Sequence, residues 1–372
     1  MTKIILLDID GVLVHPGGYR AALRATVQRF IDPNFEIQEG LLTELEKRGI
    51  SSEWDMSPLI IASYWEDILS RQPMNDLPDD VSTAARLIQD QCRVNMPGEI
   101  SIPEFALVTG QYPAETAFHA ECFSSIPAAL RKNLLTETRS VYKSNSMRTF
   151  QQYTLGSRDF SETYNLQAEF ETDSFLLKHD QSNVDEKIRA ALQQDGNHLA
   201  AFTARPSRPP RGMAVSNLGY APEAELALEL VGMKNIPLIA FGKLEYIAAQ
   251  YQLDPATLVK PSAFQALAAT LAAWTGDESA ALQAAYGWHS TGALNGRFSD
   301  LPGAFELIVV EDTMGGIRSV RAAGEILQKA GFQVEIRVLG LTSGIKAKAV
   351  AFANADVPYF ENWESLMAGI LL

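Results

Sequence analysis

Short apolar runs alternate with amphipathic stretches through the second half of the chain. The apolar runs predict strands that are buried on both faces of a sheet, and they lie at residues 198–206, 236–242, 305–313, 334–344 and 355–362. Between them, apolar residues recur at helical spacing, which predicts helices at 222–233, 243–253, 260–276, 315–331 and 363–372. Because strand and helix alternate, the pattern predicts parallel βα units in a doubly wound α/β sheet.

The first strand of this sheet is separated from the others by a long region of different character. Residues 3–7 form a further apolar run, after which helical patterns dominate, at 18–31, 53–72, 80–92 and 126–145, followed by a turn-rich stretch at 151–172. We therefore predict a core domain made of residues 1–14 and 186–372, with a mostly α-helical domain, residues 15–185, inserted after the first strand. Glycine and turn residues at 284–305 predict a surface loop, and a role near the active site or in an oligomer contact is the alternative.

Composition narrows the classes of partner. The chain has 372 residues, a length that fits two domains, and a formal net charge of -14, with 45 acidic and 31 basic side chains. This balance argues against nucleic acid or an anionic membrane as the main partner, although a small anionic substrate remains possible. The oligomeric state stays open.

Cysteine usage and hydropathy bear on the location of the protein. Two cysteines make a disulfide framework improbable and favour a reducing cytoplasm. Asp8 interrupts the first apolar run before a signal peptide could form. We find no uninterrupted apolar stretch of the ~18 residues that a membrane span needs. The sequence therefore predicts a cytoplasmic protein that does not act at a membrane.

Polar side chains follow the predicted strands where each strand ends. Carboxyl ends of parallel strands meet at one edge of the sheet, which is where such folds place their functional groups. The residues are Asp8, Asp10, Thr203, Glu311 and Asp312, and Lys260 lies just before a helix that leads back toward the sheet. We expect these side chains to converge.

Each of these residues also has a purely structural interpretation. Asp8 can form a turn with Gly11, and Thr203 can cap a turn. Lys260 can be a solvated lysine before a proline, and Asp312 can cap the helix that follows it. Because all four residues lie at or near predicted strand ends, a common site is favoured over four unrelated structural roles.

The chemistry of this set fits phosphoryl transfer. The Asp8 carboxylate can attack phosphorus to form an aspartyl-phosphate, and Asp10 can act as general acid and base. Asp8 and Asp312 offer the hard oxygen ligands that Mg²⁺ prefers. Thr203 can donate a hydrogen bond to a phosphate oxygen, and Lys260 can offset the accumulated negative charge.

Four motifs in the chain resemble those of the haloacid dehalogenase (HAD) superfamily of phosphohydrolases. They are "LLDIDGVL", "AFTA", Lys260 within "LVKPSAF", and "IVVEDTMGGIRSVRAAG". The first and fourth are specific, and the glutamate–aspartate form of the fourth resembles the β-phosphoglucomutase and phosphatase branch. The resemblance covers the Rossmann-like core, and the insertion after the first motif is similar to the helical cap of this family.

The resemblance implies roles for individual residues. Asp8 would be the nucleophile and Asp10 the acid and base, with Lys260 as the lysine of the third motif. Asp8, Asp312 and the main-chain carbonyl of Asp10 would hold Mg²⁺, with Glu311 in or near the coordination shell. A helical cap closing over the site would exclude water.

The chain also departs from the family pattern. Residues 15–18, His-Pro-Gly-Gly, replace the Asp-Ser or Asp-Thr that often follows the first motif, and the insertion is longer than usual. Lys243 competes with Lys260 for the third motif. We prefer Lys260 because of the proline and helix that follow it, although its distance in sequence from Asp312 is unusually long.

A basic loop follows the second motif. Thr203 and Ala204 begin it, and Arg205, Arg208 and Arg211 are spaced along a proline-rich segment. The loop is either a solvated basic surface or a substrate clamp, because arginine forks suit phosphate and carboxylate groups. As a clamp it would place Thr203, Ala204, Arg205 and Arg208 against the substrate.

The leading interpretation is a Mg²⁺-dependent phosphatase that acts on a small phosphorylated metabolite through an aspartyl-phosphate. One alternative is a phosphomutase of the β-phosphoglucomutase type. Another, from a different class, is a phosphate-binding protein that keeps the fold without turnover. A dehalogenase is disfavoured, because by the same resemblance such enzymes lack an acid at the position of Asp10.

Overall fold

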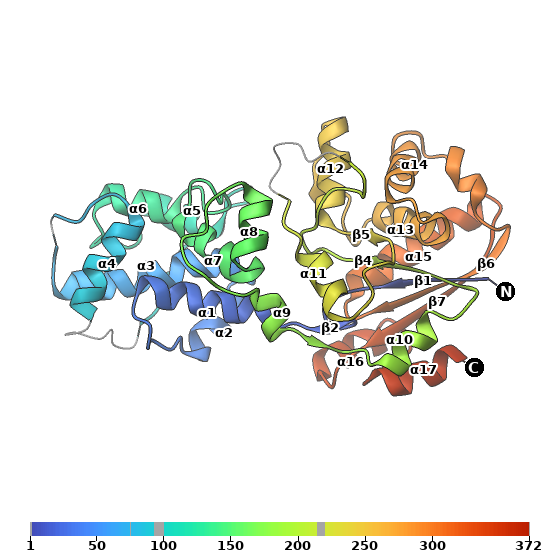
Figure 1. The fold of residues 1–372 in the computed structure, drawn as a ribbon, viewed down its shortest axis with the longest axis horizontal. Helices are drawn as coiled ribbons and strands as arrows, with labels where there is room; N and C mark the ends of the chain where they lie inside the picture. The colour runs from blue at the N-terminus through green and yellow to red at the C-terminus, as the bar shows by residue number, and fades with distance from the viewer. Residues whose placement is uncertain (1, 75, 93–99, 214–219, 372) are drawn as a thin grey trace. The chain divides into compact units, whose positions relative to one another are not determined.

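The chain folds into two compact units, shown in Figure 1. The computed structural model describes residues 2–74, 76–92, 100–213 and 220–371. Met1–Pro16 and Asp180–Leu372 form the sheet unit, and Gly17–His179 form the inserted unit. The insertion is therefore shorter than the predicted 15–185. Residues 180–185 belong with the sheet unit, since Gln181–Ser182 (β3) pair with Val14–His15 (β2) in a small antiparallel ladder.

A six-stranded parallel sheet lies at the centre of the sheet unit. In spatial order its strands are β5 (Leu238–Ile239), β4 (Asn197–Phe202), β1 (Thr2–Leu7), β6 (Ala304–Glu311), β7 (Gln333–Leu341) and β8 (Tyr359–Phe360). From β1 the chain builds outward first through β4 and β5 and then, in the other direction, through β6, β7 and β8. This order confirms the predicted Rossmann-like α/β sheet, with edge strands shorter than the apolar runs suggested.

Helices cover both faces of this sheet, as Figure 1 shows. Ile4 and Leu6 of β1 pack into one apolar cluster, and Ile5 and Leu7 into another on the opposite face. The first cluster includes residues of α12 (Phe241–Tyr251), α13 (Ala263–Thr275), α14 (Glu278–Thr291) and α15 (Met314–Lys329), and the second includes residues of α10 (Glu186–Leu192), α11 (Glu223–Leu230) and α17 (Trp363–Leu371). Strands buried on both faces explain their continuous apolar sequences. The remaining elements of this unit are η1 (Pro255–Thr257), η2 (Gly296–Asp300) and α16 (Lys346–Ala353).

Helix α14 corrects the first part, residues 284–291, of the surface loop predicted at 284–305. The Asp277 side chain accepts a hydrogen bond of 2.9 Å from the Ala280 amide and so caps the start of the helix. The helix ends at Gly292, which adopts a left-handed conformation with φ of 73°. The prediction gave weight to the glycines and overlooked the strong helix propensity of the alanines before them.

The inserted unit is helical throughout its described residues. Its helices are α1 (Gly18–Phe30), α2 (Glu39–Lys47), α3 (Glu53–Arg71), α4 (Val81–Cys92), α5 (Pro113–His119), α6 (Ala128–Leu135), α7 (Asn145–Leu155), α8 (Ser157–Tyr164) and α9 (Phe175–His179). Most of them bury apolar residues in one core of their own. The helical stretch predicted at 126–145 is interrupted, because Thr136 is extended and Glu137 takes a positive φ of 56°.

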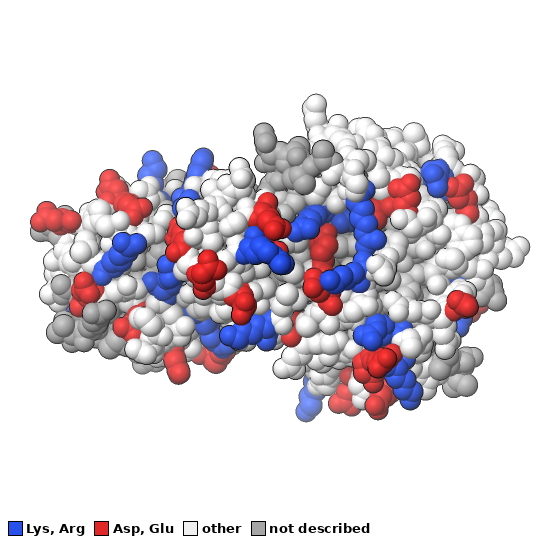
Figure 2. All heavy atoms as spheres, viewed as in Figure 1, with Lys and Arg blue, Asp and Glu red and all other residues white. Residues whose placement is uncertain are grey.

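None of the helices in the described part of the chain combines the length and apolar character that a membrane crossing requires. Figure 2 shows lysine and arginine side chains interspersed with aspartate and glutamate on the visible face of each unit. No broad basic surface appears on that face of either unit.

Candidate functional site

The fold brings the end of β1 to the point where strand order reverses. Leu7 aligns with Ala201 of β4 on one side and with Val310 of β6 on the other. The Asp8 amide donates a hydrogen bond of 3.1 Å to the Val310 carbonyl, so Asp8 continues the ladder to the strand end. In open α/β sheets this crevice is where ligands bind.

Three carboxylates converge there from β1 and β6. Asp8, Glu311 and Asp312 are only 6%, 0% and 8% exposed, and each offers an oxygen within 4.8 Å of the oxygens of the other two. Burial, reinforced by the charge of Glu311, raises the pKa of Asp8 to about 7. Burial and the charge of Asp8 raise the pKa of Asp312 to about 6. Clustered carboxylates of this kind require cations to remain ionised.

Two lysines supply positive charge to the cluster. The Lys260 ammonium lies 2.9 Å from Oδ1 of Asp8 and also forms an ion pair with Glu311. Burial would lower the pKa of Lys260, but Asp8 and Glu311 outweigh it and raise that pKa above its usual value. Lys348, at the start of α16, places its Nζ 2.5 Å from Oδ2 of Asp312.

Two carboxylate oxygens in the cluster remain open. Oδ1 of Asp8 accepts from the Ile9 amide and from Lys260, and Oδ2 of Asp312 accepts from Lys348. Oδ2 of Asp8 and Oδ1 of Asp312 accept no hydrogen bond from any described residue. Hard oxygen donors of this kind fit Mg²⁺, which takes one or two carboxylates and fills its other positions with water or substrate oxygens.

Glu311 is placed to support this pair of carboxylates. Its Oε2 accepts hydrogen bonds of 2.9 Å from both the amide and the hydroxyl of Thr313, while Oε1 meets Lys260. Both oxygens are therefore already engaged. Gly316 makes room for the Glu311 side chain, because a Cβ at that position would collide with Oε1.

Gly11 makes room for Asp312 in the same way. Its φ is 72°, a conformation that L side chains rarely adopt, and a Cβ there would overlap the Asp312 carboxylate. The turn after β1 thus needs glycine for two independent reasons. Gly11 does lie in a turn, which begins at Ile9 instead of Asp8 because the Val12 amide donates to the Ile9 carbonyl, and this turn borders the carboxylate cluster.

Thr203 occupies the end of β4, beside β1. Its main chain is fixed by hydrogen bonds, since its amide donates to Ile239 and its carbonyl accepts from Gln265 Nε2 at 2.9 Å. Its hydroxyl oxygen accepts from the Arg205 amide at 3.2 Å, which leaves the hydroxyl proton available to donate. The next residue, Ala204, is exposed.

A buried glutamine ties Lys260 to this loop. The Gln265 side chain accepts a 3.0 Å hydrogen bond from the Lys260 amide and donates to the carbonyls of Thr203 and Ile239. The Lys260 ammonium also lies 4.1 Å from the centre of the Phe202 ring. Lys260 is therefore positioned from both its main chain and its side chain.

Asp10 is held by Arg205 rather than by the lysines. Arg205 Nε lies 2.9 Å from Oδ2 of Asp10, and its Nη2 lies 2.6 Å from Oδ1. The same Nη2 donates to Asp180 at 2.9 Å, and both Arg205 and Asp180 are buried. The resulting Asp10–Arg205–Asp180 chain of ion pairs connects the end of β1 to the residue that follows the inserted unit.

The structure does not assemble the predicted arginine clamp. Arg205 is committed to two aspartates inside the protein. Arg208 is exposed, and its main chain is fixed away from the strand-end carboxylates, with its amide donating to Glu225 and its carbonyl accepting from Lys243. Arg211 donates to main-chain carbonyls, at 2.7 Å to that of Lys234, and with Arg208 it lines a separate cavity of about 450 Å³. Loop position alone could not show that Arg205 turns to the two aspartates while Arg208 and Arg211 line a separate cavity.

Lys243 forms its contacts away from the carboxylate cluster. Its buried ammonium contacts the Arg208 carbonyl at 3.0 Å and Glu225 at 3.3 Å. Of the two lysines considered for the third motif, the structure thus brings Lys260, and not Lys243, to the carboxylates.

Three residues of the site were missed by sequence reasoning. Gln265 had a detectable signal, since it is the one amide side chain in a helix whose other residues are apolar or threonine. Lys348 and Asp180 had none, because each approaches the site from a segment whose placement depends on tertiary packing.

Comparison with known proteins bears on the fold. No protein-family model matches the chain, and no curated protein matches it. The chain is similar to an X-ray structure of a Northeast Structural Genomics Consortium target, with a TM-score of 0.67 and 13% sequence identity, over 100% of this chain and 98% of that one. At this identity the likeness shows a shared fold, and it extends over both units of the chain.

Proposed function

We propose that this protein is a Mg²⁺-dependent phosphohydrolase of the HAD type, acting on a small phosphorylated metabolite. The observation that carries the proposal is the cluster at the end of β1. There a carboxylate with one open oxygen, Asp8, lies between a buried lysine, Lys260, and a second open carboxylate, Asp312. Phosphoryl transfer needs this combination of nucleophile, cation and metal ligands.

Asp8 and Asp312, with the main-chain carbonyl of Asp10, would hold the metal. Bound there, Mg²⁺ would supply positive charge against the phosphoryl oxygens. Glu311 supports the site through Lys260 and Thr313, since both of its oxygens are already occupied. Lys260 favours the charged form of Asp8, because its ammonium opposes the rise in the pKa of Asp8 that burial causes.

The reaction proceeds in two displacements. The Asp8 carboxylate attacks phosphorus as the bond to the leaving oxygen breaks, and Asp10 gives that oxygen a proton. Water then attacks the aspartyl-phosphate and gives a proton to Asp10, which releases phosphate and restores both carboxyl groups. Thr203 and the exposed main chain at Ala204 are available to hold the phosphoryl oxygens.

Arg205 acts as a positioning residue in this scheme. It grips both oxygens of Asp10, so one of these hydrogen bonds must be released when Asp10 carries the proton. The inserted unit would serve as a cap that selects the substrate.

Phosphate release tests the proposal directly. Wild-type protein is assayed with p-nitrophenyl phosphate and a panel of phosphorylated sugars, acids and nucleotides, with Mg²⁺ present or chelated. Asp8→Asn should lower release by about a thousandfold or more, because the nucleophile is lost. Asp195→Asn is the matched control, since Asp195 is exposed in the turn before β4 and should leave activity unchanged.

The alternatives give different results in the same assay. A phosphomutase converts one sugar phosphate to an isomer with little free phosphate. A non-catalytic phosphate-binding protein binds Mg²⁺ and phosphate and releases nothing from any compound. Metal-independent release, or release that survives Asp8→Asn, would overturn the proposal.

A further inference from the structure

The inserted unit contains a polar cavity of its own. It has a volume of about 380 Å³ and is lined by residues of α1, α4 and α7 and by Pro33 and Glu169. All of these elements belong to the inserted unit. Cavities between packed helices are common sites for small molecules.

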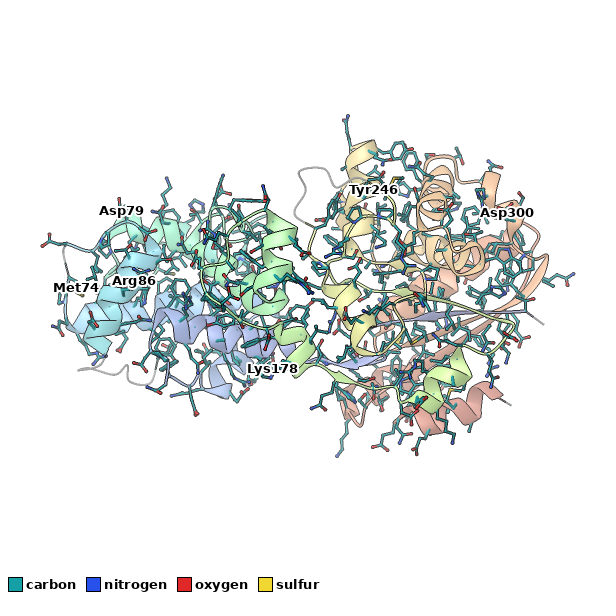
Figure 3. The ribbon with its side chains drawn as sticks, in the orientation of Figure 1. Met74, Asp79, Arg86, Lys178, Tyr246 and Asp300 are labelled. Carbon is teal, nitrogen blue, oxygen red and sulfur yellow. The ribbon has the colours of Figure 1, made fainter. Side chains whose placement is uncertain are left out.

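Two arginines of this cavity lack acidic partners. Arg86 projects from α4, where Figure 3 labels it, and forms no ion pair with any described residue. Arg29 of α1 stacks on the Phe170 ring at 4.0 Å, and it likewise has no carboxylate partner among the described residues. The cavity has one lining carboxylate, that of Glu169, and it already pairs with Arg148 at 3.3 Å. The free charge of the cavity is therefore positive.

Neutral hydrogen-bond donors line the same space. Thr149 is 2% exposed, and its hydroxyl makes no hydrogen bond to any described residue. The Ser82 hydroxyl accepts from Asn145 at 2.7 Å and keeps its own proton to donate. The amide groups of Gln28 and Gln89 donate to the carbonyls of Phe35 and Arg29, so both side chains are already fixed. A hydroxyl with a free proton, beside two exposed guanidinium groups that lack acidic partners, is an arrangement suited to an oxyanion, and Arg29 is held in place by Phe170 and by a hydrogen bond with Tyr153.

We propose that this cavity binds a small organic anion through its phosphate or carboxylate group, with Arg29, Arg86 and Thr149 as the residues that hold it. Arginine presents a planar fork that matches either group. The site is separate from the carboxylate cluster of the sheet unit, and it does not depend on the phosphohydrolase proposal. It would give the inserted unit a recognition role of its own.

Hydrogen exchange with two probe anions tests the site. The full-length chain is titrated with inorganic pyrophosphate or with citrate, without added Mg²⁺ and at constant ionic strength. Affinity is measured by calorimetry and location by hydrogen–deuterium exchange. Binding should protect α1, α4 and α7 and leave the other helices of the inserted unit unchanged. Protection by pyrophosphate alone assigns phosphate compounds, and protection by citrate alone assigns carboxylates.

Matched substitutions separate this site from general attraction to charge. Arg86→Gln should weaken binding by about tenfold or more, because a charge-assisted hydrogen bond is lost. Thr149→Val should weaken it less, and both variants should unfold at the wild-type temperature without anion. Arg158→Gln removes the same charge from an exposed position on α8 and should leave affinity unchanged. Absence of protection by either anion, or equal weakening by Arg86→Gln and Arg158→Gln, would overturn the proposal.

Discussion

Replacement of Lys260 by methionine tests the electrostatic balance at the end of β1. Lys260 is the ammonium that lies between Asp8 and Glu311, and the three side chains are almost fully buried. Methionine preserves most of the aliphatic bulk and removes the charge. The variant therefore leaves two buried carboxylates without the cation that they share.

The expected loss of stability follows from this burial. Removing one partner of a buried ion pair costs about 3–5 kcal/mol. In a unit of this size each kcal/mol shifts Tm by about 2–4 °C, so Tm should fall by about 6–20 °C at pH 8.

The loss should depend on pH with a definite sign. The pKa of Asp8 is already raised from 3.8 to about 7, and without Lys260 it should rise further. A carboxyl group with a raised pKa takes up a proton on folding, so its stabilising contribution is complete below the unfolded pKa and is lost as pH rises through the folded one. The deficit of Lys260→Met should therefore be largest near pH 8 and shrink toward pH 5.

Thermal unfolding of the full-length chain at pH 5 to 8, with and without Mg²⁺, measures these effects. Mg²⁺ should restore much of the lost Tm, since a cation bound to Asp8 replaces the missing charge. Lys243→Met is the matched control, because Lys243 is also a buried lysine paired with a glutamate, Glu225. This variant should also lose stability, but Mg²⁺ should not restore its Tm. A wild-type Tm at pH 8, or a deficit that grows toward pH 5, would refute the reasoning.

Three further predictions concern the same site. Gly11→Ala should cost about 1–3 kcal/mol of stability and abolish Mg²⁺-dependent stabilisation in thermal unfolding, because the Cβ of the new alanine displaces Asp312. Gly276→Ala is the control, since Gly276 has a similar positive φ of 74° and open space around it, and this variant should lose stability alone. Mg²⁺ affinity, measured by calorimetry, should fall steeply as pH drops from 8 to 5, because Asp8 and Asp312 have pKa values of about 7 and 6 and must lose protons to bind metal; affinity that is constant over this range would contradict the assignment. Arg205→Gln should lower kcat for p-nitrophenyl phosphate by about a hundredfold and move the pH optimum with little change in KM, and a loss confined to KM would argue against a positioning role.

The sheet could be predicted from sequence because the burial of its strands produces a local pattern of apolar residues. Strands covered on both faces appear as continuous apolar runs, and β1, β4, β6 and β7 were recognised in this way. The patterns were weaker where burial is partial. Helix α14 was missed because its exposed residues and its glycine resemble those of a loop, and the cap at Asp277 was not considered.

The site was predictable to the extent that sheet topology alone determines it. Asp8, Thr203 and Asp312 each follow a strand, so parallel pairing brings them together whatever the details of packing. The partners of Arg205 and Lys348 could not be predicted, since a pairing between distant segments depends on side-chain direction. For the same reason the sequence could not decide whether the basic loop is a solvated surface or a clamp, because the direction of Arg205 depends on its pairing with Asp10 and Asp180.

The small ladder between β2 and β3 has a consequence for how this chain can change. His15 and Gln181 are aligned partners in an antiparallel pair, so the two ends of the insertion lie next to each other. A turn of a few residues could close that gap, and the six strands of the parallel sheet would keep their order and direction without the insertion. Recombination at this pair of adjacent chain ends could exchange one insertion for another of any length. The strand ends that carry Asp8 and Asp312 would stay in place. Recognition and chemistry can therefore diversify independently in proteins built on this plan.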